Sequence, residues 1–163
     1  MRLPLAIALT GMALWAGPAT SAEDPASRAW IGKRVNFFMS LCSATAPSFS
    51  RYKTAARESG FGTGSDGHQH YKATEIVASI RNVGGQCDCL VSFGTDNPKL
   101  AADMILRRLL SRYGSKFQAD EDPQSLGVLK TAAGNLSVQV VTMHQGKGQW
   151  IGAVVHGKQR CPA

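Results

Sequence analysis

The sequence lacks the short motifs that identify most enzymes and cofactor-binding proteins. Its 163 residues contain no nucleophile motif, no zinc-ligand spacing, no phosphate-binding loop and no dinucleotide fingerprint. A redox-type C-x-x-C pair is also missing, and no internal repeat or low-complexity segment is visible. These absences leave no motif that favours an enzyme, and we expect a binding protein without a cofactor.

Long apolar runs are missing beyond the first residues of the chain. Arg2 precedes an apolar stretch over Leu3–Trp15. A short run of small residues ends at Ala22, after which a signal peptidase would cleave. A run of about a dozen residues is too short for the ~20-residue span of a membrane helix. We therefore predict a signal peptide over 1–22, a periplasmic or secreted location, and no transmembrane segment in the mature chain.

The mature chain, residues 23–163, has the size of one domain with one core. The full sequence has 18 Lys and Arg against 11 Asp and Glu, a formal net charge of +7. A basic surface favours anionic partners, although charge alone can also serve only to keep a protein in solution. Nucleic acid is not expected as a partner, because the chain is exported and no aromatic ladder accompanies its basic residues.

Four cysteines, Cys42, Cys87, Cys89 and Cys161, predict two disulfides in an oxidising compartment. Cys87 and Cys89 lie at i and i+2 of a predicted strand, where their Cα atoms are about 6.5 Å apart along an extended backbone. A bond between these two is therefore disfavoured. Each should bond to Cys42 or Cys161, and both such pairings stay open.

A metal site is the alternative use of these cysteines, with His68 and His70 as further ligands. The C-x-C and H-x-H spacings are not those of common structural zinc sites, and oxidation would remove the thiolates. We therefore predict no bound metal, and His68 and His70 are kept only as the metal-binding alternative.

Hydrophobic periodicity predicts an α+β domain with two N-terminal helices, one long central helix and an antiparallel sheet of about five strands. The sheet would combine a hairpin with a three-strand meander, and the order of its strands is left open. The helices are predicted over 27–42, 48–59 and 98–113, and the strands over 75–83, 87–93, 126–131, 136–144 and 150–156.

The segment 62–70 is rich in glycine and has no apolar period, which predicts a surface loop. Asp66, His68 and His70 make it a candidate binding loop, and the alternative is a solvated connection whose histidines face water. An enzyme centred on this loop would need a further group, such as His144 or His156, to converge with it.

Basic residues gather at the end of the central helix and near the C-terminus. We group them as a candidate anion-binding patch of Arg107, Arg108, Arg112, Lys158 and Arg160. The arginines alone are also explained by the negative end of the helix dipole.

The sequence thus favours a small exported binding protein that contacts another protein or an anionic envelope component through a rigid, disulfide-linked surface. The alternatives are an inhibitor or immunity protein of a periplasmic enzyme, inserting a loop such as 62–70, and a metal-binding protein. The oligomeric state is left open.

Overall fold

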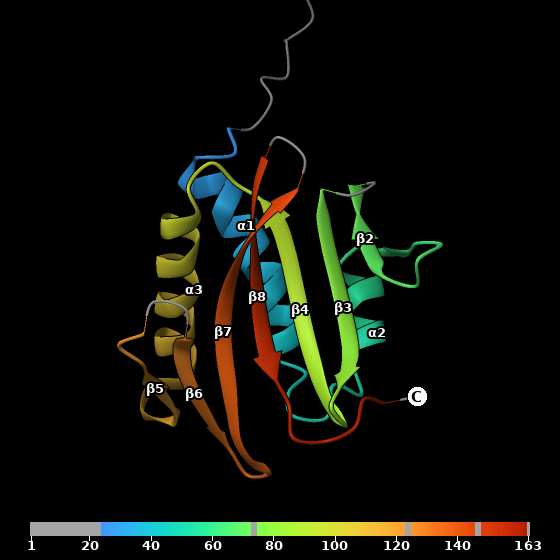
Figure 1. Ribbon diagram of the computed structural model, residues 1–163, viewed down its shortest axis with the longest axis vertical. Helices are drawn as coiled ribbons and strands as arrows, with labels where there is room; N and C mark the ends of the chain where they lie inside the picture. Colours follow the sequence, from blue (N-terminus) through green and yellow to red (C-terminus); the bar gives the residue numbers. More distant parts are fainter. Residues whose placement is uncertain (1–23, 73–74, 123–124, 146–147, 163) are drawn as a thin grey trace, which may run out of the picture.

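The computed structural model describes residues 24–72, 75–122, 125–145 and 148–162, so the predicted signal peptide lies outside the described residues. Within these ranges the chain forms three α-helices and one eight-stranded antiparallel sheet (Figure 1). The helices are α1 (Arg28–Phe38), continued by the π-helical turn η1 (Met39–Ser43), α2 (Tyr52–Glu58) and α3 (Pro98–Tyr113), followed by the 3₁₀ turn η3 (Gly114–Lys116). The strands are β1 (Gly62–Thr63), β2 (Gln69–Tyr71), β3 (Ile76–Val83), β4 (Gln86–Gly94), β5 (Phe117–Ala119), β6 (Ser125–Thr131), β7 (Gly134–Gln145) and β8 (Gly148–His156).

The strand order is β1-β2-β3-β4-β8-β7-β6-β5. Two four-strand meanders therefore lie side by side and are joined by antiparallel pairing of β4 with β8, from Asp88 opposite His156 to Gly94 opposite Trp150. Each meander follows a helical segment in the chain. The two halves repeat one order of elements, although the sequence shows no repeat.

The α+β class is confirmed, but the expected number of about five strands is too small. The three additional strands, β1, β2 and β5, are two or three residues long and lie at or next to the sheet edges. Strands this short show no alternation of apolar and polar residues, which is the pattern that reveals a strand in a sequence. The segment 62–70, expected to be a loop, is correspondingly a short hairpin in which Gly62 pairs with His70.

The helix ends follow local sequence signals. Ser27 caps α1 by accepting a hydrogen bond from the Trp30 N–H, and Asn97 caps α3 in the same way, followed by Pro98 in the first turn. Gly114 ends α3 at a positive φ of 51°. None of the described helices combines the length and apolar character needed to cross a bilayer.

The core lies between one face of the sheet and helices α1 and α3, which pack beside each other (Figure 1). Alternate residues of the central strands point into it. Its buried side chains include Ile31, Val35, Phe38, Ile105 and Leu109 from the helices and Ile76, Ala78, Val91, Phe93, Val138, Ile151, Ala153 and Val155 from the sheet.

Two disulfides tie the outer elements to β4. Cys42 of η1 bonds to Cys89, and Cys87 bonds to Cys161, with Cα–Cα distances of 5.4 and 4.6 Å. The prediction that Cys87 and Cys89 take distant partners is confirmed, and the structure selects one of the two pairings that the sequence left open. All four sulfurs are bonded, so none is present as a thiolate. The two bonds are consistent with an extracytoplasmic protein.

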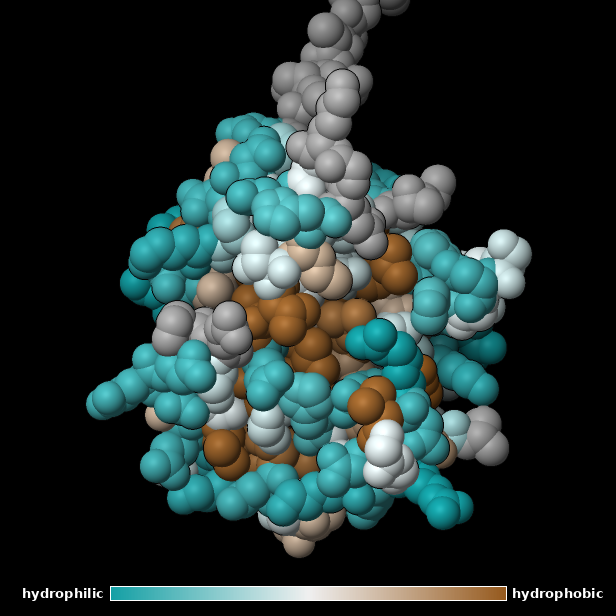
Figure 2. Space-filling model, viewed as in Figure 1, coloured by the Kyte–Doolittle hydropathy of each residue, from teal (hydrophilic) through white to brown (hydrophobic). Residues whose placement is uncertain are grey.

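The opposite face of the sheet is covered by no described helix. Figure 2 looks onto this face and shows apolar side chains at its centre with hydrophilic ones around them. Gly152 lies at the centre, where an added Cβ would come within 2.9 to 3.1 Å of the side chains of Leu90, Val141 and Met143. These residues, together with Val154, are called the open patch below.

Candidate anion-binding site

A groove of about 830 Å³ runs along the outer surface between α1 and α3. The two helices approach closely at Gly32, where an added Cβ would lie 3.3 Å from the Met104 Cε. A larger residue at this point would require the end of the flexible Met104 side chain to move. At this crossing a small residue of α1 faces a flexible side chain of α3.

Four cations from the two helices line this groove, and none of the described residues that line it is acidic. Arg28 and Lys33 come from α1, and Arg107 and Arg108 come from α3. All four side chains are exposed. The remaining lining residues are small, polar or apolar: Ala29, Gly32, Asn36, Met104 and Ser111. We call this hollow the basic groove.

The candidate anion patch is divided by the fold. Arg107 and Arg108 line the basic groove, whereas Arg112 lines a separate hollow with Arg51 and Glu58. Lys158 and Arg160 lie in the segment after β8, where the Lys158 side chain is close to Gly134 at the β6–β7 turn. The structure thus brings together two of the five residues.

Two residues of the groove, Arg28 and Lys33, were missed by the sequence analysis. Both are more than 70 positions away from the arginines of α3, so no sequence window contains the set. A signal was nevertheless present. Lys33 falls between the buried positions Ile31 and Val35 of α1, and Arg28 is the first residue of the same helix, so both belong to a segment whose helical period is visible in the sequence.

In the hairpin 62–70, Asp66 is engaged by its own loop. Its carboxylate lies 2.9 Å from the His70 Nε2 and accepts a hydrogen bond from the His68 N–H at 3.0 Å. These hydrogen bonds, first that of His70, hold the pKa of Asp66 below its ordinary value. Gly64 leaves room for the His70 ring, which a Cβ would contact. The loop thus brings Asp66 and His70 together and uses both to hold its own conformation.

The other histidines lie elsewhere. His144 is on β7 and His156 is on β8, and β3 and β4 separate β8 from β2. The convergence that an enzyme centred on 62–70 would need is therefore not formed with either residue. Among the described residues, no group of three or more His, Cys, Asp or Glu side chains is placed to hold a metal ion.

The His156 side chain is held by residues of the two strands that flank β8. Its Nδ1 lies 3.0 Å from a carboxylate oxygen of Asp88 on β4, and its Nε2 lies 3.1 Å from the Gln139 Oε1 on β7. Asp88 is buried. This contact depends on the pairing of β4 with β8, which no local pattern of the sequence reveals.

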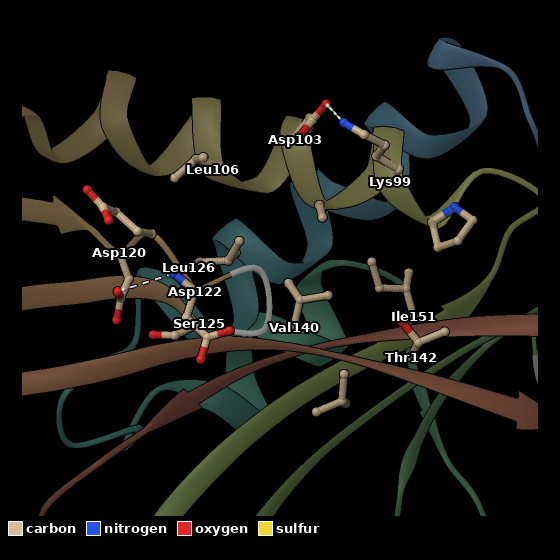
Figure 3. Close-up of a pocket in the computed structure, with 14 residues that line it drawn as sticks. Lys99, Asp103, Leu106, Asp120, Asp122, Ser125, Leu126, Val140, Thr142 and Ile151 are labelled. Atoms are coloured by element: carbon tan, nitrogen blue, oxygen red, sulfur yellow. Dashed lines mark hydrogen bonds and ion pairs between the residues drawn. The ribbon is translucent and has the colours of Figure 1, made fainter.

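A separate cleft, of about 660 Å³, lies on the other side of α3, toward the sheet. Figure 3 shows Lys99 and Asp103 on its helical rim, Asp120 and Asp122 across from them, and Val140 and Ile151 deeper in the hollow. Hydrogen bonds from the Ser125 side chain and from the backbone lower the pKa of Asp120. With Glu121, four acidic side chains line this cleft. The acids are thus kept away from the basic groove.

Comparison with protein-family models, curated proteins and solved structures found no match.

The basic groove has the chemistry of a binding site for anions. Guanidinium groups stay protonated and present planar pairs of N–H donors to phosphate, sulfate or carboxylate oxygens. Among the described residues that line the groove there is no histidine, cysteine or carboxylate. Its residues can attract, orient and hold an anionic group.

Proposed function

We propose that this protein is an exported, non-enzymatic binding protein that holds an anionic component of the cell envelope in the basic groove. The observation that carries the proposal is the convergence of four cations from α1 and α3 on one hollow with no acid among its described lining residues. The predicted signal peptide and the two disulfides support the location.

The disulfide of η1 contributes to this function by fixing the groove before the ligand arrives. Cys42 lies in the turn that continues α1, and its bond to Cys89 anchors that turn to the central strand β4. The Tyr113 hydroxyl at the end of α3 donates a hydrogen bond to the Ser43 carbonyl at 2.8 Å. Both walls of the groove are thereby held together, which lowers the entropic cost of binding.

Charge reversal in the groove tests the proposal. In the variant Arg107→Glu/Arg108→Glu, we expect the affinity for inorganic tripolyphosphate to fall at least about tenfold, because two attractive charges become repulsive. Both side chains are exposed, so the fold should be retained. Isothermal titration calorimetry at low and high salt measures the effect, and binding by the unaltered protein should weaken with salt.

A matched control separates the groove from net charge. The variant Lys158→Glu/Arg160→Glu changes the charge by the same amount at exposed residues outside the groove. It should bind tripolyphosphate nearly as well as the unaltered protein. Equal losses in the two variants would show that only overall charge matters and would contradict a site between α1 and α3.

The open patch supports a second candidate function, contact with another protein. Apolar patches of this kind on a sheet face mark interaction surfaces. Val141 of this patch is 38% exposed, and none of the five residues of the patch carries a charge. Its best complement is another apolar surface, and a second copy of the chain supplies one in an isologous, face-to-face arrangement.

A charge in the open patch tests this self-association. We expect the unaltered protein to form dimers as its concentration rises and Val141→Glu to stay monomeric, as measured by sedimentation equilibrium. Val83→Glu places the same charge on a residue that is 53% exposed at the far end of β3, and it should dimerise normally. A monomeric unaltered protein at every concentration would exclude this second function.

A further inference from the structure

A second hollow lies across α1 from the basic groove. This hollow, of about 400 Å³, is lined by Lys33, Arg34, Asn36, Phe37, Tyr71 and Lys72. Lys33 and Asn36 line both hollows. They form a polar ridge of α1 with a basic hollow on each side.

The second hollow combines cations with aromatic rings. The rings of Phe37 and Tyr71 are 4.9 Å apart, and both contact Phe61, which is buried beneath them. The Lys72 ammonium lies 5.6 Å from the centre of the Tyr71 ring. Phe37 and Tyr71 are half-buried, so a supported aromatic surface borders the hollow next to an exposed cation.

We infer that the ligand of this site is an extended acidic glycan that crosses α1 and occupies both hollows. The inference rests on the proposed function of the basic groove and names its ligand class. The groove cations bind the acidic groups of one end, while the apolar face of a sugar ring packs on Tyr71 and Lys72 pairs with its acidic substituent. A helix with its side chains is about 10–12 Å across, so inorganic phosphate or a single sugar cannot reach both hollows.

Other polyanions fit the two hollows less well. Single-stranded nucleic acid stacks successive bases on aromatic side chains, but none of the described residues that line the basic groove carries an aromatic ring. A membrane-surface site presents large exposed apolar side chains beside its cations. The exposed large apolar residues among those described are Val83, Leu110 and Val141, and none lines either hollow.

A length series of sulfated oligosaccharides, from disaccharide to octasaccharide, tests the inference by titration calorimetry. We expect affinity to rise by about tenfold or more once the chain is long enough to reach both hollows, and then to level off. Lys72→Glu and Tyr71→Leu should remove this rise and leave tripolyphosphate binding unchanged. Tyr71→Phe keeps the aromatic ring and should retain the rise of affinity with glycan length. Lys130→Glu reverses an exposed charge on β6, outside both hollows, and serves as the control that should also retain the rise.

The outcomes separate the two proposals. Suppose that Arg107→Glu/Arg108→Glu weakens tripolyphosphate binding but the affinity of the unaltered protein shows no step with glycan length. The glycan inference is then overturned, while anion binding in the basic groove is supported. If tripolyphosphate does not bind in the groove, both are overturned. Single-stranded DNA or vesicles of anionic phospholipid that bind more tightly than the octasaccharide, with the same loss in Tyr71→Leu, would overturn the glycan in favour of that ligand.

Discussion

Removal of the Cys42–Cys89 disulfide is expected to lower the free energy of unfolding by about 4 kcal/mol. The bond closes a loop with a sequence separation of 47, and the loss of loop-closure entropy from the unfolded chain accounts for roughly this amount. Both cysteines are fully buried, so Cys42→Ala/Cys89→Ala also loses packing in the core. Because domains of this size are stable by only about 5–15 kcal/mol, this loss removes a large part of the stability of the fold.

Urea denaturation followed by circular dichroism measures this loss. The second disulfide provides the comparison, since Cys87→Ala/Cys161→Ala opens a loop of separation 74 and should cost a similar amount through entropy. Only the first variant detaches η1 from β4, so only it should also weaken tripolyphosphate binding in the basic groove. A loss below about 1 kcal/mol in Cys42→Ala/Cys89→Ala would contradict the role assigned to this bond.

Glu75→Gln is expected to lower the free energy of unfolding by about 3 kcal/mol. Glu75 forms an ion pair with Arg34, whose side chain is 4% exposed at the interface between α1 and the sheet. The Arg34 Nη1 also donates to the Trp30 carbonyl at 2.9 Å, and the guanidinium lies over the Trp30 ring. Gln keeps the shape of the side chain but removes the negative charge of Glu75 from beside the buried guanidinium. Glu75 is 24% exposed, which places the cost at the lower end of the range for buried pairs.

A double-mutant cycle identifies the cause of this loss. Arg34→Met/Glu75→Gln removes the buried charge and keeps an unbranched side chain in the same space, so it should be more stable than Glu75→Gln alone. Urea denaturation of the four proteins gives the coupling free energy. If Glu75→Gln stays within about 0.5 kcal/mol of the unaltered protein, the ion pair does not contribute to the attachment of α1.

The elements with local signals were predictable from the sequence. The caps at Ser27 and Asn97, the end of α3 at Gly114 and the inward face of β4 each depend on residues a few positions apart. The short strands β1, β2 and β5 were not predicted, because two or three paired residues leave no period to detect. Their strand conformation comes from hydrogen bonding to a neighbour that is already in place.

The candidate site was predictable only in part. Arg107 and Arg108 stand out as neighbours on one helix, but their companions Arg28 and Lys33 belong to another helix. Grouping the arginines with Lys158 and Arg160 followed charge alone, and the fold places those two in the segment after β8. Charge along a sequence shows how many cations a surface has, and the packing of helices decides which of them meet.

By itself, the sequence determined the α+β class, the positions of the main helices and strands, and the exclusion of a Cys87–Cys89 bond, because each follows from the local geometry of the backbone. Only the tertiary structure decided that β4 pairs with β8, that Cys42 bonds to Cys89, and that α1 and α3 enclose a basic groove. These features join residues dozens of positions apart. They arise from burying the sheet face and both helices in one core, which selects among arrangements that are locally equivalent.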